Sequence, residues 1–169
     1  MIKKLCVIGA GTMGAGIAQV AVEKGIEVAM RDVEDRFVEK GLGTIRNFLG
    51  KKVEKGKLSA AERDAILGRL KGTTSMEKAA EGADMVIEAV IEDLALKQKV
   101  FAELDRLCVP GVILASNTST LSITKIASVT KHPTRVLGTH FFSPVPVMRL
   151  GEVISGEQTD AKVLDAALE

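Results

Sequence analysis

Three segments of the chain place side chains that can exchange protons directly after short apolar runs. Glu88 ends one run, the polar segment 116–119 follows another, and His140 follows a third. If these runs are parallel strands, their carboxyl ends meet at one edge of a sheet, and all three places face one crevice. Histidine takes up and returns protons near neutrality, which suits an alcohol–ketone interconversion coupled to hydride transfer. The alternative for His140 is a core histidine hydrogen-bonded to backbone.

A carboxylate partner for His140 is available further along the chain. Two prolines force a non-helical turn after His140, and the strand-like segment 150–154 follows. This turn could bring Glu152 back against the imidazole, where it would fix the tautomer and stabilise the imidazolium. The alternative is a surface glutamate on an edge strand. The second histidine, His132, lies in a polar turn and is predicted to be solvated rather than catalytic.

A glycine pattern near the amino terminus predicts a nucleotide site. The segment reads Gly9-Ala10-Gly11-Thr12-Met13-Gly14, which matches G-x-G-x-x-G between a predicted strand and a predicted helix ending near Gly25. In this motif Gly9 permits the tight turn, Gly11 lets backbone approach a pyrophosphate, and Gly14 lets helix and strand pack closely. The first helical turn, with Thr12 and Met13, offers N–H groups to an anion.

The second predicted strand ends at Asp32, about 20 residues beyond the glycines, as the dinucleotide-binding motif requires. A carboxylate there accepts both ribose hydroxyls of adenosine and repels a 2′-phosphate, so NAD is favoured over NADP. Arg31 beside it could instead pair with a phosphate. A glycine-rich turn without a ligand is the alternative reading of the whole motif.

The positioning elements follow from the spacing of apolar residues. Apolar runs occur at 5–8, 28–30, 85–90, 112–115 and 136–138, and all but one are separated by segments of helical periodicity. This alternation predicts an α/β Rossmann fold, a doubly wound and mostly parallel sheet wrapped by helices.

Three helical segments carry more specific expectations. The polar segment 34–71 is predicted as an excursion of two helices broken at 56–59, with Ser59 and Glu62 as a capping box. In the helix 93–108 an apolar face should cover the sheet, and its charged residues, Lys97 among them, should mostly point away. The segment 159–169 is predicted as a helix that either is cut off or simply frays.

Bulk composition excludes several classes of protein. The 169 residues, 46% of them hydrophobic, suffice for one domain, here taken as 1–169. A net charge of +1 provides no field for nucleic acid or an anionic membrane. The chain has no long apolar run and no room for a signal peptide, so a cytoplasmic protein is expected. Cys6 and Cys108 are predicted as buried free thiols, and no metal cluster is expected.

The chain resembles the L-3-hydroxyacyl-CoA dehydrogenases, and most closely the short bacterial 3-hydroxybutyryl-CoA dehydrogenases. The segments that carry the resemblance are 7–19, 87–93, 115–119 and 140–148. The resemblance implies that His140 is the general base and Glu152 its orienting partner. It implies that Ser119 hydrogen-bonds the substrate's 3-oxygen, with Asn117 shaping the site.

For the cofactor half, the resemblance implies NAD as the coenzyme. Asp32 would hold its adenine ribose, while Glu88 and Asp93 would lie near the nicotinamide. The implied reaction interconverts a (S)-3-hydroxyacyl-CoA and a 3-ketoacyl-CoA by hydride transfer. The lysines at 51, 52, 55 and 57 lie where the family contacts coenzyme A, with Lys55 the chosen candidate; a solvated helix face is the alternative.

Two departures from the family limit these expectations. Ser143 stands where the family often has asparagine. The family also has a second, all-helical domain that completes the substrate site and forms a homodimer, and the 169 residues contain no equivalent of it, so weak turnover is expected. Two alternatives stay open: a related NAD-dependent dehydrogenase acting on a sugar acid, and a non-catalytic, crystallin-like NAD-binding protein.

Overall fold

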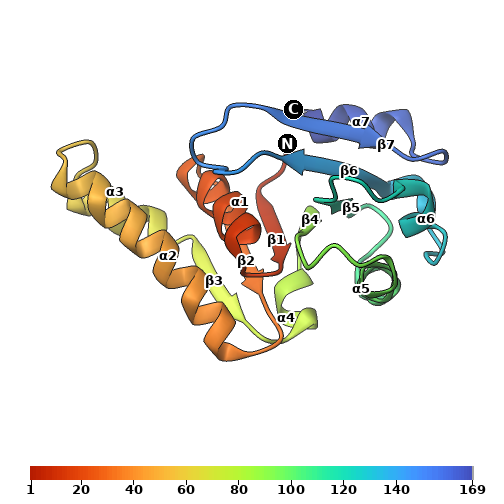
Figure 1. The fold of residues 1–169 in the computed structure, drawn as a ribbon, viewed down its shortest axis with the longest axis horizontal. Helices are drawn as coiled ribbons and strands as arrows, with labels where there is room; N and C mark the ends of the chain where they lie inside the picture. Colours follow the sequence, from red (N-terminus) through yellow and green to blue (C-terminus); the bar gives the residue numbers. More distant parts are fainter. Residues whose placement is uncertain (169) are drawn as a thin grey trace.

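The computed structural model describes residues 1–168, which form one seven-stranded sheet flanked by helices (Figure 1). The strands are β1 (Lys4–Ile8), β2 (Glu27–Arg31), β3 (Leu70–Thr73), β4 (Met85–Glu88), β5 (Ile113–Ser116), β6 (Val136–Phe141) and β7 (Gly151–Ser155). The helices are α1 (Thr12–Glu23), α2 (Asp35–Glu54), α3 (Ala60–Leu67), α4 (Met76–Ala80), α5 (Leu94–Leu107), α6 (Ile123–Ala127) and α7 (Ala161–Leu168), with a short 3₁₀ turn at Pro133–Arg135.

The strand order confirms the predicted fold class. The sheet runs β3-β2-β1-β4-β5-β6-β7, with parallel pairing from β3 to β6 and β7 antiparallel to β6. The first six strands have the order of a doubly wound dinucleotide-binding sheet. The order reverses between β1 and β4, so a crevice is expected beyond their carboxyl ends.

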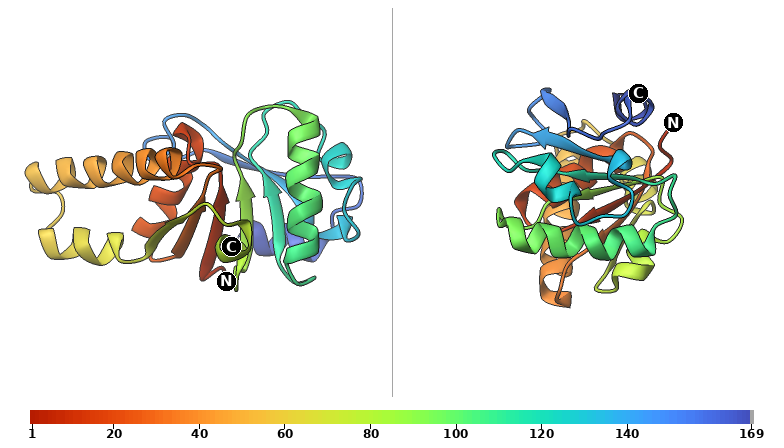
Figure 2. Two further views of the ribbon diagram at one scale, coloured as in Figure 1. Left: turned by 90° about the horizontal axis from the view of Figure 1, so that it is seen from below. Right: turned by 90° about the vertical axis from the view of Figure 1, so that its right-hand side faces the viewer.

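Helices cover both faces of the sheet because its central strands are apolar on both sides. In β1, Leu5 and Val7 pack with α1 and α2, whereas Cys6 and Ile8 pack with α4, α5 and α6. Figure 2 shows α5 on the face of the sheet opposite α1. Both predicted free cysteines are buried and unbridged, and burial raises the pKa of both thiols.

The excursion after β2 forms the two predicted helices. The structure places α2 and α3 side by side as a projecting pair (Figure 2). Ser59 and Glu62 make the expected capping box, with the Glu62 amide donating to the Ser59 hydroxyl at 3.2 Å. The prediction was incomplete at the end of this segment, where Leu70 begins the edge strand β3. The short helices α4 and α6 were also not predicted.

The chain beyond β6 folds back over α1 before it enters β7. Val145, in this return loop, is buried. A Cβ added to Gly16 of α1 would lie only 2.9 Å from the Cβ of Val145. The absence of a side chain at Gly16 therefore lets the loop dock on the helix. The described part of the predicted C-terminal helix is α7; Glu169, its last predicted residue, lies outside the described residues.

A buried arginine joins the end of α5 to β6. Arg135 is 3% exposed and donates to the Asp105 carboxylate at 2.8 Å and to the Cys108 carbonyl at 3.2 Å. Burial acts to raise the pKa of Asp105, but hydrogen bonds from Arg135, Lys131 and His132 hold it below its usual value. His132 is half-exposed, and its Nδ1 lies 3.2 Å from Asp105 Oδ1, so it is not simply solvated. In the described residues no helix has the length and apolarity to cross a bilayer.

Candidate active site

The antiparallel pairing of β6 with β7 brings the predicted acid–base pair together. His140 lies directly opposite Glu152 in the register, and His140 Nδ1 is 2.8 Å from Glu152 Oε2. Because a carboxylate only accepts hydrogen bonds, the Nδ1–H donates, which leaves Nε2 as the acceptor nitrogen. The imidazole is mostly buried, and its ring packs 4.5 Å from that of Phe142. The sequence prediction of this pair's proximity is confirmed.

The loop after β5 supplies the hydroxyl that faces His140. Ser119 Oγ lies 3.1 Å from His140 Nε2, so the three side chains form a continuous relay from Ser119 to Glu152. Asn117 ties the two strand ends together, because its Oδ1 accepts the amide N–H of Phe141 at 2.9 Å. These contacts place Ser119 and the acceptor nitrogen of His140 at the mouth of one crevice.

This crevice has a volume of about 350 Å³ and lies between the glycine loop and the ends of β4, β5 and β6. Its lining residues are Met13, Ala89, Val90, Glu92, Asn117, Ser119, His140, Phe141, Phe142 and Ser143. The segments 116–119 and 140 therefore face one space, as predicted from the strand ends. Glu88 is missing from the lining.

Two sequence predictions about charged residues are wrong. Glu88 does not face the crevice, and Lys97 does not point away from the sheet; both side chains are fully buried and form an ion pair at 2.7 Å. The ammonium of Lys97, in the first turn of α5, reaches the Glu88 carboxylate at the end of β4, so this side chain points inward. A charge buried in this way is stable only when it is paired and hydrogen-bonded.

Glu92, which the sequence analysis did not single out, is the carboxylate of this loop that reaches the crevice. Its Oε1 accepts the Thr118 hydroxyl and the amide N–H groups of Ser119 at 3.1 Å and Thr120 at 3.3 Å. Lys97 lies 3.4 Å from its other oxygen. Partial burial acts to raise the pKa of Glu92, but these donors and Lys97 hold it below its usual value.

The sequence predicts Asp93, rather than its neighbour Glu92, near the nicotinamide. The structure shows Asp93 as the N-cap of α5, with Oδ1 accepting the amide N–H of Leu96 at 2.7 Å. An acidic residue before an amphipathic helix is the usual sign of a cap, and this sign could have assigned Asp93 to the helix and left Glu92 for the crevice.

The glycine loop has the geometry that a dinucleotide requires. Gly9 has a φ of +103°, which favours glycine, and a Cβ on Gly14 would overlap the carbonyl oxygen of Gly9. At Gly11 no atom lies within 4 Å of where a Cβ would be, and α1 has no side-chain cap. An uncapped helix start beside open space at Gly11 fits the pyrophosphate of NAD, because the first-turn N–H groups of a helix have no intrahelical partners.

Asp32 lies at the end of β2, beside this loop. Its carboxylate accepts the amide N–H of Ala10 at 2.7 Å and that of Val33 at 2.7 Å, which leaves lone pairs for ribose hydroxyls. Arg31 is tied elsewhere, because its Nε donates to the carbonyl of Thr74, in the loop before α4, at 3.1 Å. The geometry therefore favours NAD and gives no support to pairing of Arg31 with a 2′-phosphate.

The lysines of the excursion differ in availability. Lys52 is half-buried and forms an ion pair with Glu23 of α1, which joins α1 to α2. Lys51, Lys55 and Lys57 are exposed around the end of α2, where Lys55 is the C-cap. The three exposed lysines can therefore contact a phosphate group of a ligand, whereas Lys52 would first have to break its ion pair with Glu23.

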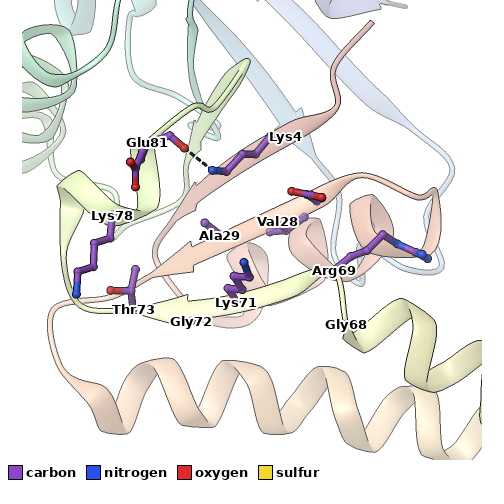
Figure 3. Close-up of a pocket in the computed structure, with 11 residues that line it drawn as sticks. Lys4, Val28, Ala29, Gly68, Arg69, Lys71, Gly72, Thr73, Lys78 and Glu81 are labelled. Carbon is purple, nitrogen blue, oxygen red and sulfur yellow. Dashed lines mark hydrogen bonds between the residues drawn. The ribbon is translucent and has the colours of Figure 1, made fainter.

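A larger hollow of about 530 Å³ lies against β2 and β3 and holds none of the predicted site residues (Figure 3). Figure 3 shows the Lys4 ammonium donating to the carbonyl of Glu81. Lys71 lies on the edge strand β3, and Lys78 reaches from α4 toward the Thr73 end of that strand. Neither the glycine loop 9–14 nor His140 lines this hollow. The crevice at the strand ends is therefore the candidate active site.

Comparison with known proteins identifies the family. Residues 4–169 match the model of the 3-hydroxyacyl-CoA dehydrogenase NAD-binding domain. A probable 3-hydroxybutyryl-CoA dehydrogenase of Bacillus subtilis is 49% identical over 158 residues, which cover 94% of this chain and 55% of the relative. The 3-hydroxybutyryl-CoA dehydrogenase of Clostridioides difficile is 45% identical, over 98% of this chain and 59% of the relative.

Solved structures agree with these relatives. The crystal structure of (S)-3-hydroxybutyryl-CoA dehydrogenase from Ralstonia eutropha superposes with a TM-score of 0.95 at 43% identity, covering 99% of this chain and 59% of that chain. The chain thus spans little more than half the length of these relatives. It belongs to the 3-hydroxyacyl-CoA dehydrogenase family, of which it is the NAD-binding domain.

Proposed function

We propose that this domain, in its complete protein, catalyses NAD-dependent interconversion of a (S)-3-hydroxyacyl-CoA and a 3-ketoacyl-CoA, with 3-hydroxybutyryl-CoA as the substrate. The observation that carries this proposal is the Ser119–His140–Glu152 relay, which opens into a crevice beside the glycine loop. A cytoplasmic location is part of this proposal.

In the direction of oxidation, His140 Nε2 takes the proton of the substrate's 3-hydroxyl as C3 loses its hydride. The Glu152 carboxylate, 2.8 Å from Nδ1, stabilises the imidazolium that results. Ser119 Oγ, 3.1 Å from Nε2, holds the reacting oxygen against the base. A short distance between base and hydroxyl makes the proton transfer effectively intramolecular.

The other half of the site holds the cofactor. NAD, when bound, supplies the hydride acceptor. The N–H groups at the start of α1 bind its pyrophosphate, and Asp32 binds the adenine ribose. Glu92 lines the same crevice as His140 and would lie near the nicotinamide, whereas Glu88 and Asp93 act by holding the loop.

Recognition of coenzyme A is assigned to the exposed lysines of the excursion. Lys55 is free at the end of α2, while Lys52 is engaged with Glu23. Replacing Lys55 by alanine should raise the KM for an acyl-CoA, because a phosphate contact is lost, and leave NADH binding unchanged. Lys52→Ala is the matched control and should change the KM less.

The remainder of the protein is proposed to supply a helical domain that closes the substrate site and forms a homodimer. The relatives extend well beyond the aligned region, which leaves room for such a domain. The isolated 169-residue chain should therefore bind NAD and turn over acetoacetyl-CoA weakly.

The test is reduction of acetoacetyl-CoA by NADH in the full-length protein. His140→Ala should abolish turnover because the base is gone, and should leave NADH affinity nearly unchanged. His132→Ala, which removes the other histidine far from the crevice, should keep turnover. Normal turnover in His140→Ala would refute the assignment, and reduction of a keto sugar acid instead would assign the sugar-acid alternative.

A further inference from the structure

A fully buried ion pair lies directly beneath the crevice. Lys97 of α5 and Glu88 of β4 have no exposed side-chain surface, and their charged atoms are 2.7 Å apart. Removing two charges from water is costly, and an apolar pair of similar volume is often at least as stable. The pair is therefore poorly explained by stability alone.

Glu88 connects four segments that build the site. Its Oε1 accepts the Lys97 ammonium and the amide N–H of Val90, each at 2.7 Å. Its Oε2 accepts the Ser116 hydroxyl, also at 2.7 Å. The carboxylate thus fixes the end of β4, the loop after it, α5 and the end of β5 to one point.

The contacts continue from this point to the reacting groups. Lys97, held by Glu88, lies 3.4 Å from Glu92, and Glu92 accepts the amide N–H of Ser119 at 3.1 Å. Ser119 Oγ in turn lies 3.1 Å from His140 Nε2. The link between Lys97 and Glu92 is an ion pair and the other links are hydrogen bonds, so a shift of Glu88 would be passed on to the Ser119 loop.

We propose that Glu88 is a positioning residue for the proposed reaction: by fixing Lys97, it makes Glu92 hold the Ser119 loop at the distance from His140 that proton transfer requires. The inference rests on the proposed function. It replaces the expectation that Glu88 lies near the nicotinamide, since Glu88 is fully buried and does not line the crevice. Burial acts to raise the pKa of Glu92, and the fixed ammonium adds to the hydrogen bonds, that of Thr118 first, which hold it below its usual value.

Neutralising the whole pair separates positioning from stability. Glu88→Gln alone leaves the buried Lys97 ammonium with only the more distant and partly exposed Glu92 as counter-charge, and should destabilise the fold. Glu88→Gln with Lys97→Met removes both charges, so the urea midpoint of the 169-residue chain should return toward that of wild type. The matched control is Glu23→Gln with Lys52→Met, which neutralises the ion pair between α1 and α2.

Kinetics of the full-length double variant then decide the question. Misplacement of a reacting group costs up to about 100-fold in rate, so kcat should fall by about 10- to 100-fold while the KM for acetoacetyl-CoA changes little. The control pair should keep kcat. Recovery of both stability and kcat in the Glu88–Lys97 double variant would overturn the proposal.

A second readout does not depend on turnover. In ¹H–¹⁵N NMR spectra of the 169-residue chain, the Ser119 amide and the His140 Nε2 resonances should move in the double variant, and stay in place in the control. Unmoved resonances would overturn the positioning role. If the wild-type full-length protein fails to reduce acetoacetyl-CoA, the proposed function fails, while this spectrum still decides whether Glu88 positions the loop.

A milder variant covers the case in which the double variant does not fold. Ser116→Ala removes one hydrogen bond to Glu88 and leaves the ion pair intact. One lost hydrogen bond is worth a factor of about ten, so kcat should fall by about that factor and the Ser119 amide should shift. Unchanged kcat and an unchanged Ser119 resonance would overturn the proposal.

Discussion

Two glycines of the nucleotide loop should respond in opposite ways to the same added methyl group. Gly11 has open space where a Cβ would be, and its φ of −69° is accessible to alanine, so Gly11→Ala should fold normally. A Cβ on Gly14 would overlap the carbonyl oxygen of Gly9, which is backbone in a tight turn. Gly14→Ala should therefore destabilise the fold.

The magnitudes follow from what each methyl group displaces. At Gly11 the methyl group occupies the space proposed for the pyrophosphate and separates it from the N–H groups of α1. Loss of one hydrogen bond to a charged group costs about 1.5–3 kcal/mol. NAD should then bind about 10- to 100-fold more weakly, because 1.4 kcal/mol corresponds to tenfold. At Gly14 forced overpacking should lower the free energy of unfolding by about 3 kcal/mol.

Both effects are measurable on the 169-residue chain. Calorimetric titration with NADH gives the affinity, and urea denaturation gives the free energy of unfolding. The expected pattern is a Gly11→Ala protein of wild-type stability with weak binding, and a Gly14→Ala protein of low stability. If Gly11→Ala binds NADH as wild type does, the pyrophosphate does not pass over this glycine and the reasoning is refuted.

Three further predictions concern other parts of the chain. By calorimetry, NADP should bind at least about tenfold more weakly than NAD, because Asp32 repels a 2′-phosphate. Asp32→Gly should reduce this difference in affinity. Equal affinities of the wild-type protein for NAD and NADP would defeat the argument. Asp105→Ala should lower unfolding free energy by about 3–5 kcal/mol at neutral pH, because Arg135 stays buried and charged. The pKa of Asp105 is depressed in the folded state, so its carboxylate stabilises the fold above about pH 3.9, and this stabilisation is lost as the pH falls through the folded pKa. In urea denaturation, the difference in unfolding free energy between wild type and Asp105→Ala should therefore shrink in acid. A difference that does not change with pH would contradict this argument. Gly16→Ala should push Val145 away and loosen the return loop, raising its amide hydrogen exchange; unchanged exchange would argue against tight docking.

Local signals predicted much of this fold and site. The glycine loop and the capping box at Ser59 are set by residues near one another in sequence, and the structure confirms both. The prediction from the strand ends is confirmed for the segments after β5 and β6, which line the crevice, and is wrong for Glu88. The Glu152–His140 contact was a hypothesis from a turn and a strand, and the β6–β7 register bears it out.

The features that sequence reasoning missed depend on contacts distant in the chain. A lysine in an amphipathic helix is expected to face water, and only the buried carboxylate of Glu88 explains why Lys97 does not. The edge strand β3 has no apolar run, because none of its residues is fully buried and Gly72 lies against α2 without a side chain, so its periodicity is weak. Glu92 was overlooked because its partners lie on the Ser119 loop, beyond all of α5.

The most direct test of the proposed function follows the hydride itself. The full-length protein is incubated with acetoacetyl-CoA and NADH deuterated at the transferred position of nicotinamide C4, and the product is analysed by mass spectrometry. We predict one deuterium at C3 of (S)-3-hydroxybutyryl-CoA with the wild-type protein and no product with His140→Ala. Product without deuterium at C3, or equal deuterium transfer by the His140→Ala variant, would contradict the account.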